Sequence, residues 1–177
     1  MNTKLLAFEY SVYQLHNWYK EVYGNSETND LSTLKVLKLL FFISAVNSDK
    51  NTQDTLIDLI FNKFWAMPYG HVESEVYDFI KNGQIKNITL NNSSSSILNL
   101  DNILKLDLNS KNMIDKNIKL LKEINIDLIK YSSIDLVELS HRWYSWQKNY
   151  KIALSNNSFS QNIPIEDIKG EIKVYQY

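Results

Sequence analysis

Three histidines, His16, His71 and His141, are the side chains in this sequence best suited to acid–base or metal chemistry near neutral pH. They lie far apart, and none has the His-x-x-x-His or Glu-x-x-His spacing that places metal ligands on one helix face. Ser140 precedes His141, but adjacent helical positions point in different directions, which argues against a nucleophile–base pair. We therefore expect no catalytic residue and no metal site.

Motifs for binding phosphate or activating a serine are also missing. The four glycines are scattered, with no Gly-x-Gly-x-x-Gly, P-loop or Gly-x-Ser-x-Gly pattern. The absence of cysteine excludes disulfides, thiolate nucleophiles and cysteine-ligated zinc. The sequence thus predicts a protein that is not an enzyme, with no cofactor and no small-molecule substrate.

The charge balance restricts the classes of partner. There are 19 basic and 20 acidic residues, a formal net charge of −1, and Arg142 is the single arginine. Such a chain lacks the basic surface typical of nucleic-acid and anionic-lipid binding, so a nucleic-acid partner is not expected. No apolar run approaches 18 residues, and the N-terminal segment lacks the apolar core of a signal peptide. We expect a cytoplasmic protein with no membrane contact.

The elements expected to position any site are mainly helical. Apolar residues at helical spacing predict a single compact helical domain spanning residues 1–177, with about six helices. The second of these is apolar on most sides, so it should be central, with Lys35 and Lys38 as its solvated edge. A polar region near 84–109 predicts a long loop excursion, and its serine-rich stretch 91–96 cannot bury much surface. The helices are expected near 4–23, 33–46, 54–66, 72–82 and 110–124. A further helix is expected to be capped by Ser132 or Ser133 and to bury Leu136, Leu139, Trp143 and Trp146.

A tight corner at residues 65–71 joins the third and fourth of these predicted helices. Pro68 disfavours helical angles at the residue before it, and Gly70 permits a sharp reversal of the chain. We expect this corner to leave Trp65, Tyr69 and His71 near its rim. Because Tyr69 is on a turn, it is the better candidate for exposure.

The aromatic content is unusually high, with 4 tryptophans, 11 tyrosines and 7 phenylalanines. The first predicted helix carries more rings than one buried face can hold, and Tyr10 and Tyr13 fall off its apolar stripe. Surplus aromatic residues on a helix favour a protein–protein interface, because they bury a large area at modest entropic cost. The alternative is that these tyrosines have no functional consequence. The candidate partner-binding residues are Tyr10, Tyr13, Tyr69 and His71.

Three blocks of sequence carry a resemblance to a known family. Residues 31–42, Leu-Ser-Thr-Leu-Lys-Val-Leu-Lys-Leu-Leu-Phe-Phe, resemble a helix of the Panacea (SocA-like) antitoxin domain. Residues 65–77, with their Trp-Ala, Pro-Tyr-Gly and Val-Tyr elements, are similar to the family's central signature. Residues 139–146, Leu-Ser-His-Arg-Trp-Tyr-Ser-Trp, resemble its late helix. The chain departs from the usual pattern in the order of Trp65 and Ala66 and in having His71 after the glycine.

The resemblance implies a function that composition alone does not give. Proteins with this domain serve as antitoxins, so it implies an antitoxin that neutralises a cognate toxin protein by direct binding. Two alternatives remain open on the sequence. In the first, the protein is an adaptor that delivers a partner to a protease. In the second, it is a DNA-binding autoregulator, which the charge balance disfavours.

Overall fold

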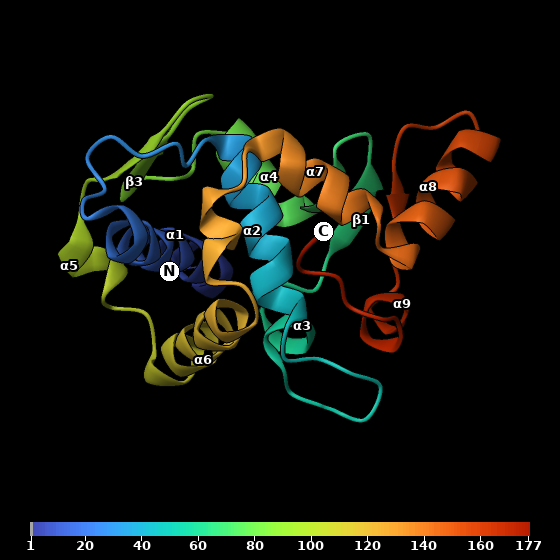
Figure 1. Cartoon of the computed structure of the whole chain (residues 1–177), viewed down its shortest axis with the longest axis horizontal. Helices are drawn as coiled ribbons and strands as arrows, with labels where there is room; N and C mark the ends of the chain where they lie inside the picture. The colour runs from blue at the N-terminus through green and yellow to red at the C-terminus, as the bar shows by residue number, and fades with distance from the viewer. Residues whose placement is uncertain (1) are drawn as a thin grey trace.

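The structure is a computed structural model that describes residues 2–177 (Figure 1). It confirms a mainly α fold, but these residues form nine α-helices, not about six, together with one 3₁₀ helix and five short strands. The helices are α1 (Thr3–Tyr23), α2 (Thr33–Ala45), α3 (Leu56–Leu59), α4 (Ser74–Lys81), α5 (Leu100–Ile103), α6 (Leu108–Ile124), α7 (Ser133–His141), α8 (Tyr144–Ser155), α9 (Ile165–Gly170) and the 3₁₀ helix η1 (Ile126–Lys130). The strands are β1 (Phe64–Met67), β2 (Gly70–Glu73), β3 (Ile88–Leu90), β4 (Ser95–Ile97) and β5 (Gln161–Asn162).

Helix α2 lies at the centre of the molecule and contacts α1, α3, α6, α7 and β2 (Figure 1). Its N-cap is Ser32, whose side-chain oxygen accepts from the Lys35 amide. The expectation of a solvated lysine edge is wrong, because Lys35 and Lys38 are both fully buried. The ammonium of Lys35 reaches Asp30 at 2.7 Å, whereas Lys38 donates to a backbone carbonyl of β2. Helix α2 is therefore enclosed on all sides.

The predicted helix over 54–66 is only partly present. Helix α3 begins with a capping box between Thr55 and Asp58, but the chain leaves the helix after Leu59 and continues as strand β1. Strands β1 and β2 form an antiparallel hairpin with Trp65 opposite Val72 and Met67 opposite Gly70. The apolar spacing imitates a helix here, but aromatic residues flanking a Pro-Tyr turn favour a strand pair. Strand β5 pairs with the other edge of β1, giving the order β2-β1-β5.

The excursion near 84–109 contains more regular structure than expected. It forms the β3–β4 hairpin and the short helix α5. The serine-rich stretch is tied by side-chain hydrogen bonds, since the Asn91 carboxamide oxygen accepts from the amides of Ser93 and Ser94 at 2.8 and 2.9 Å. Ser95 is buried, and its hydroxyl lies 2.9 Å from Nε2 of His16 on α1.

The predicted helix after Ser132 is divided into two. Ser132 caps α7 as expected, but α7 ends at His141 and α8 begins at Tyr144. Trp143, at the break, is fully buried, while Trp146 in the first turn of α8 is only half-buried. The break changes the direction of the chain, so α8 leaves the central bundle and contacts β1 and β5 (Figure 1).

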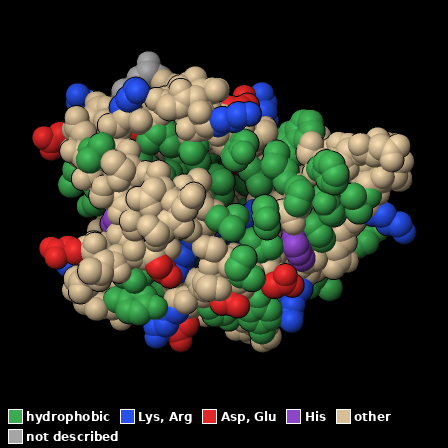
Figure 2. Space-filling model, turned by 90° about the horizontal axis from the view of Figure 1, so that it is seen from above, with side chains coloured by type: hydrophobic (Ala, Val, Ile, Leu, Met, Phe, Trp, Pro, Cys, Tyr) green, Lys and Arg blue, Asp and Glu red, His purple; other side chains and the backbone are tan. Residues whose placement is uncertain are grey.

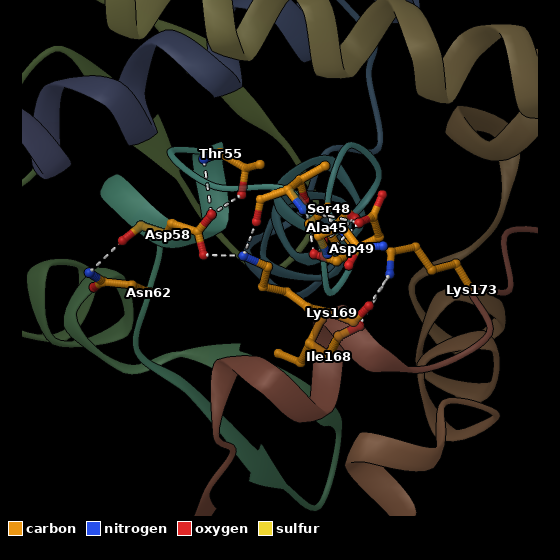
Figure 3. A network of polar contacts seen from close by, with 11 residues as sticks. Ala45, Ser48, Asp49, Thr55, Asp58, Asn62, Ile168, Lys169 and Lys173 are labelled. Carbon is orange, nitrogen blue, oxygen red and sulfur yellow. Dashed lines mark hydrogen bonds and ion pairs between the residues drawn. The ribbon is translucent and has the colours of Figure 1, made fainter.

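The C-terminal segment is attached to the first half of the chain by Lys169 (Figure 3). Lys169 of α9 donates to Oδ1 of Asp58 at 2.8 Å and to the carbonyl of Thr52 at 2.7 Å. After α9, the tail crosses Trp143, whose indole N–H donates to the Val174 carbonyl at 2.9 Å. Tyr175 is buried against the rings of Phe42 and Trp143, so the tail contributes this side chain to the core.

Candidate functional site

The turn between β1 and β2 projects one large side chain into solvent. Gly70 has φ +91°, a conformation that glycine adopts without strain, and it closes the reversal that Pro68 begins. The Tyr69 side chain at the tip is 62% exposed. The structure therefore confirms the expectation that Tyr69 is accessible.

Side chains from α7 and α8 hold the backbone of this turn. The indole N–H of Trp146 donates to the Met67 carbonyl at 2.9 Å, and Nε2 of His141 lies 3.2 Å from the Pro68 carbonyl. On the β2 side, the His71 amide donates to Oγ of Ser140 at 3.1 Å. These contacts come from two helices and fix the turn on both sides of Tyr69.

His71 lies beneath the turn and not at its rim, so the expectation of a rim position is wrong. It is fully buried, with Nδ1 2.8 Å from Oγ of Ser140 and Nε2 2.8 Å from Oγ of Ser145. Its ring stacks on Phe41 with centroids 3.7 Å apart. Burial and the neighbouring Lys38 hold the pKa of His71 well below its usual value, so it is neutral.

The side chain of Lys38 is enclosed next to the same strand. It donates to the backbone carbonyl of His71 and makes no ion pair within residues 2–177. Burial lowers the pKa of Lys38 to about 7. Although histidine, serine and lysine meet here, all of them are inaccessible, so the cluster supports the turn and offers no surface to a substrate.

Stacked rings lie beside the turn. His141 stacks on Trp146 with centroids 3.8 Å apart, and Trp146 stacks on Tyr150 at 4.8 Å. We define Tyr69, His141, Trp146 and Tyr150 as the hairpin-tip surface. Seen from above, hydrophobic side chains gather over the end of the molecule that carries β1, α7 and α8 (Figure 2). This end combines a fixed exposed tyrosine with partly exposed rings, which is typical of protein-binding surfaces.

Tyr10 and Tyr13, the candidate partner-binding residues on α1, are not part of the hairpin-tip surface. Tyr10 is buried, and its hydroxyl donates to Oδ1 of Asp115 on α6 at 3.0 Å. Burial raises the pKa of Tyr10 to about 12. Tyr13 is half-buried, with its ring centroid 6.0 Å from that of Tyr10. Lys4 at the start of α1 pairs with Glu73 at the end of β2 at 2.7 Å, but Tyr10 and Tyr13 lie further along α1, where Tyr10 contacts α6. The structure therefore does not bring the four candidates together.

The turn and the side chains that hold it lie within a part of the chain that matches a known protein family. The family model described as "Antitoxin SocA-like, Panacea domain" matches residues 36–147. The chain belongs to this SocA-like Panacea family. The Panacea match includes most of α2, the hairpin, α7 and the start of α8, and thus Ser140, His141 and Trp146, which hold the turn. No curated protein and no solved structure matches the chain.

The described part of this Panacea protein, residues 2–177, contains neither a metal-binding cluster nor a membrane-spanning helix. Within residues 2–177, no cluster of three His, Cys, Asp or Glu side chains has the geometry to hold a metal ion. Over the same residues, no helix has the length and apolar content needed to cross a membrane.

Sequence reasoning missed most residues that support Tyr69. Ser140, His141 and Trp146 belong to the third block of the Panacea resemblance, but nothing in their spacing indicates that they bond a turn 69 to 79 positions earlier. Lys38 gave no signal either, because a lysine in an apolar helix ordinarily marks the solvated side. A glycine preceded by Pro-Tyr was the one local clue to the turn.

Proposed function

We propose that this Panacea protein is an antitoxin that neutralises a cognate toxin by binding it directly, and that the hairpin-tip surface is the contact. The observation that carries the proposal is the fixed, solvent-exposed Tyr69 turn. Membership of the antitoxin SocA-like family supports the class of partner. In this proposal the protein forms a stable inactive complex and performs no catalysis.

The physical argument rests on preorganisation. Tyrosine and tryptophan are enriched among the residues that dominate binding energy, since they bury a large area with few rotatable bonds. Ordering a loop on binding costs free energy, which a turn already held by Ser140, His141 and Trp146 avoids. The backbone that carries Tyr69 is thus held in one position before any partner arrives.

We further propose that residues 1–177 act as one Panacea-like unit. The pairing of β5 with β1 and the packing of the tail on Trp143 support this, because both join segments outside the matched range to residues inside it. On this view the hairpin-tip surface depends on the C-terminal segment for its support.

Co-expression tests the proposal. The chain is expressed with the growth-arresting protein encoded beside it, and the pair is then purified through a tag on the antitoxin. We expect growth to resume and a stoichiometric complex to elute. Continued growth arrest with no complex would contradict the proposal.

Two further results would redirect the assignment. Loss of the toxin from the cell, restored by removing a protease, would identify an adaptor. Salt-resistant binding to a DNA fragment carrying the protein's own promoter would identify an autoregulator.

A further inference from the structure

One face of α8 is exposed along its whole length, and among residues 2–177 its ion pair is that of Lys148 with Asp167 of α9. Tyr144 is 64% exposed and Ile152 39% exposed, and both lie on this outer face. The face forms a shallow depression with a volume of about 510 Å³. It is lined by Tyr144, Gln147, Lys148, Lys151, Ile152 and Ser155.

The charge of this region differs from that of the chain. Residues 139–165 contain Arg142, Lys148 and Lys151 and no carboxylate, although acidic residues slightly outnumber basic ones overall. Lys148 pairs with Asp167 at 2.9 Å. Lys151 is exposed and makes no ion pair with any residue of the described range 2–177. The outer face of α8 therefore presents two lysines beside apolar side chains, and the acidic partner of Lys148 comes from α9 and not from α8 itself.

We propose that the outer face of α8 binds an acidic amphipathic helix of the toxin. Tyr144 and Ile152 pack against its apolar side chains, and Lys148 and Lys151 pair with its carboxylates. This inference rests on the proposed function and adds the chemistry of the partner. The face adjoins the hairpin-tip surface, because Trp146 and Tyr150 lie on the neighbouring side of the same helix.

The spacing of the face favours a helical partner. Residues 144, 148, 151, 152 and 155 follow the i, i+4, i+7 rows that form ridges on a helix and pack into the grooves of another helix. Charge complementarity then selects a carboxylate-bearing helix over a neutral one.

A polypeptide fits this face better than a nucleic acid. Two lysines and no arginine on the face offer little for a phosphate backbone, and the whole chain carries a formal charge of −1.

Charge reversal tests the inference on the intact complex. The Lys148→Glu/Lys151→Glu double variant is compared with wild type by calorimetry, using the toxin whose growth arrest the chain relieves. We expect binding to be weakened about tenfold or more, and the wild-type affinity to fall more steeply with salt than that of the variant. The control is Lys116→Glu/Lys119→Glu on α6, which changes net charge equally at exposed positions and should leave the affinity within about twofold of wild type.

A single variant separates binding from folding. Lys151→Glu alone leaves the Lys148–Asp167 pair in place, so α8 keeps its contact with α9. We expect it to weaken binding several-fold with an unchanged thermal unfolding midpoint. Unchanged affinity of both α8 variants would overturn the inference while leaving the antitoxin proposal intact.

Peptides identify the occupant directly. Overlapping 15-residue peptides of the same toxin are tested against wild type and the double variant. We expect the peptides that bind wild type, and lose affinity for the double variant, to be acidic with apolar residues at helical spacing. Neutral or basic peptides in that set would overturn the inference, as would a single-stranded oligonucleotide that competes with the toxin for α8. Failure of the chain to relieve any arrest would remove the proposed function and this inference together.

Discussion

Gly70 lies in direct contact with Ser140, so closely that a Cβ added to Gly70 would be 2.9 Å from the Cβ of Ser140 and would overlap its hydroxyl. The contact joins the β1–β2 turn to α7 at the point where the His71 amide bonds the same serine. It explains why glycine is needed here for space as well as for its positive φ.

Gly70→Ala should therefore be destabilising for two reasons, strain and overlap. Gly24→Ala is the matched control, since Gly24 has a similar φ of +86° but open space around the missing Cβ. We expect Gly24→Ala to cost about 1 kcal/mol, and Gly70→Ala to cost about 1–3 kcal/mol more because of overpacking. Urea unfolding of both variants measures this, and equal losses would show that Ser140 moves aside freely.

Lys38 should make the stability of the protein depend on pH above neutrality. Its pKa in the folded state, about 7, is below its unfolded value near 10.5, so only the unfolded chain takes up the proton between these values. The free energy of unfolding contributed by this group therefore rises with pH across that window, by at most about 1.4 kcal/mol per pH unit. In Lys38→Met this rise should disappear, as measured by urea unfolding at pH 7, 8 and 9. Lys119→Met, at an exposed position, should keep the wild-type slope.

Tyr69→Ala should weaken toxin binding without affecting the fold. The side chain is 62% exposed, so its removal loses interface area and not core packing. We expect a loss of more than about 1 kcal/mol in binding free energy if Tyr69 is an anchor, with an unchanged thermal midpoint. Tyr77→Ala is the control, because Tyr77 is also exposed but lies on α4. A toxin affinity that falls equally in both variants would argue against the hairpin-tip surface.

Lys169→Met should loosen the C-terminal segment. Burial raises the pKa of Asp58, but hydrogen bonds from Lys169 and Thr55 outweigh it and leave the pKa below its usual value. The ionised Asp58 carboxylate therefore stabilises the folded state fully above the pKa of Asp58 in the unfolded chain. This contribution is lost as the pH falls through the lower pKa of Asp58 in the folded state. We expect faster amide hydrogen exchange in α9 of the variant at pH 7, and a smaller loss of stability on acidification than in wild type. Lys130→Met, which breaks the exposed pair with Asp127, should change neither.

The helices that were predicted correctly carry their signals locally. Gly24 ends α1 in a left-handed conformation, with its amide bonded to the Lys20 carbonyl at 2.8 Å, and Ser32 and Ser132 cap the helices that follow them. Such caps depend on residues within one helical turn, so sequence alone is enough to find them. Asp107 likewise caps α6 through the Ser110 amide, so that α6 begins at Leu108, two residues before the expected start.

The hairpin and its support depend on residues distant in the sequence. The spacing of Leu56, Ile60 and Phe64 imitates a helix, and only the pairing of β1 with β2 and β5 decides otherwise. The burial of His71 depends on Ser140 and Ser145, which are 69 and 74 positions away. Exposure of Tyr69 was predictable because a turn tip faces solvent whatever packs below it.

The 79 positions between Met67 and Trp146 also set an order of events during translation. The hairpin leaves the ribosome long before α7 and α8 exist, and β5 and the Val174 carbonyl emerge later still. Because contacts between distant segments form late in folding, a nascent chain has the Tyr69 sequence without its geometry. Only a finished polypeptide presents that tyrosine in its fixed position.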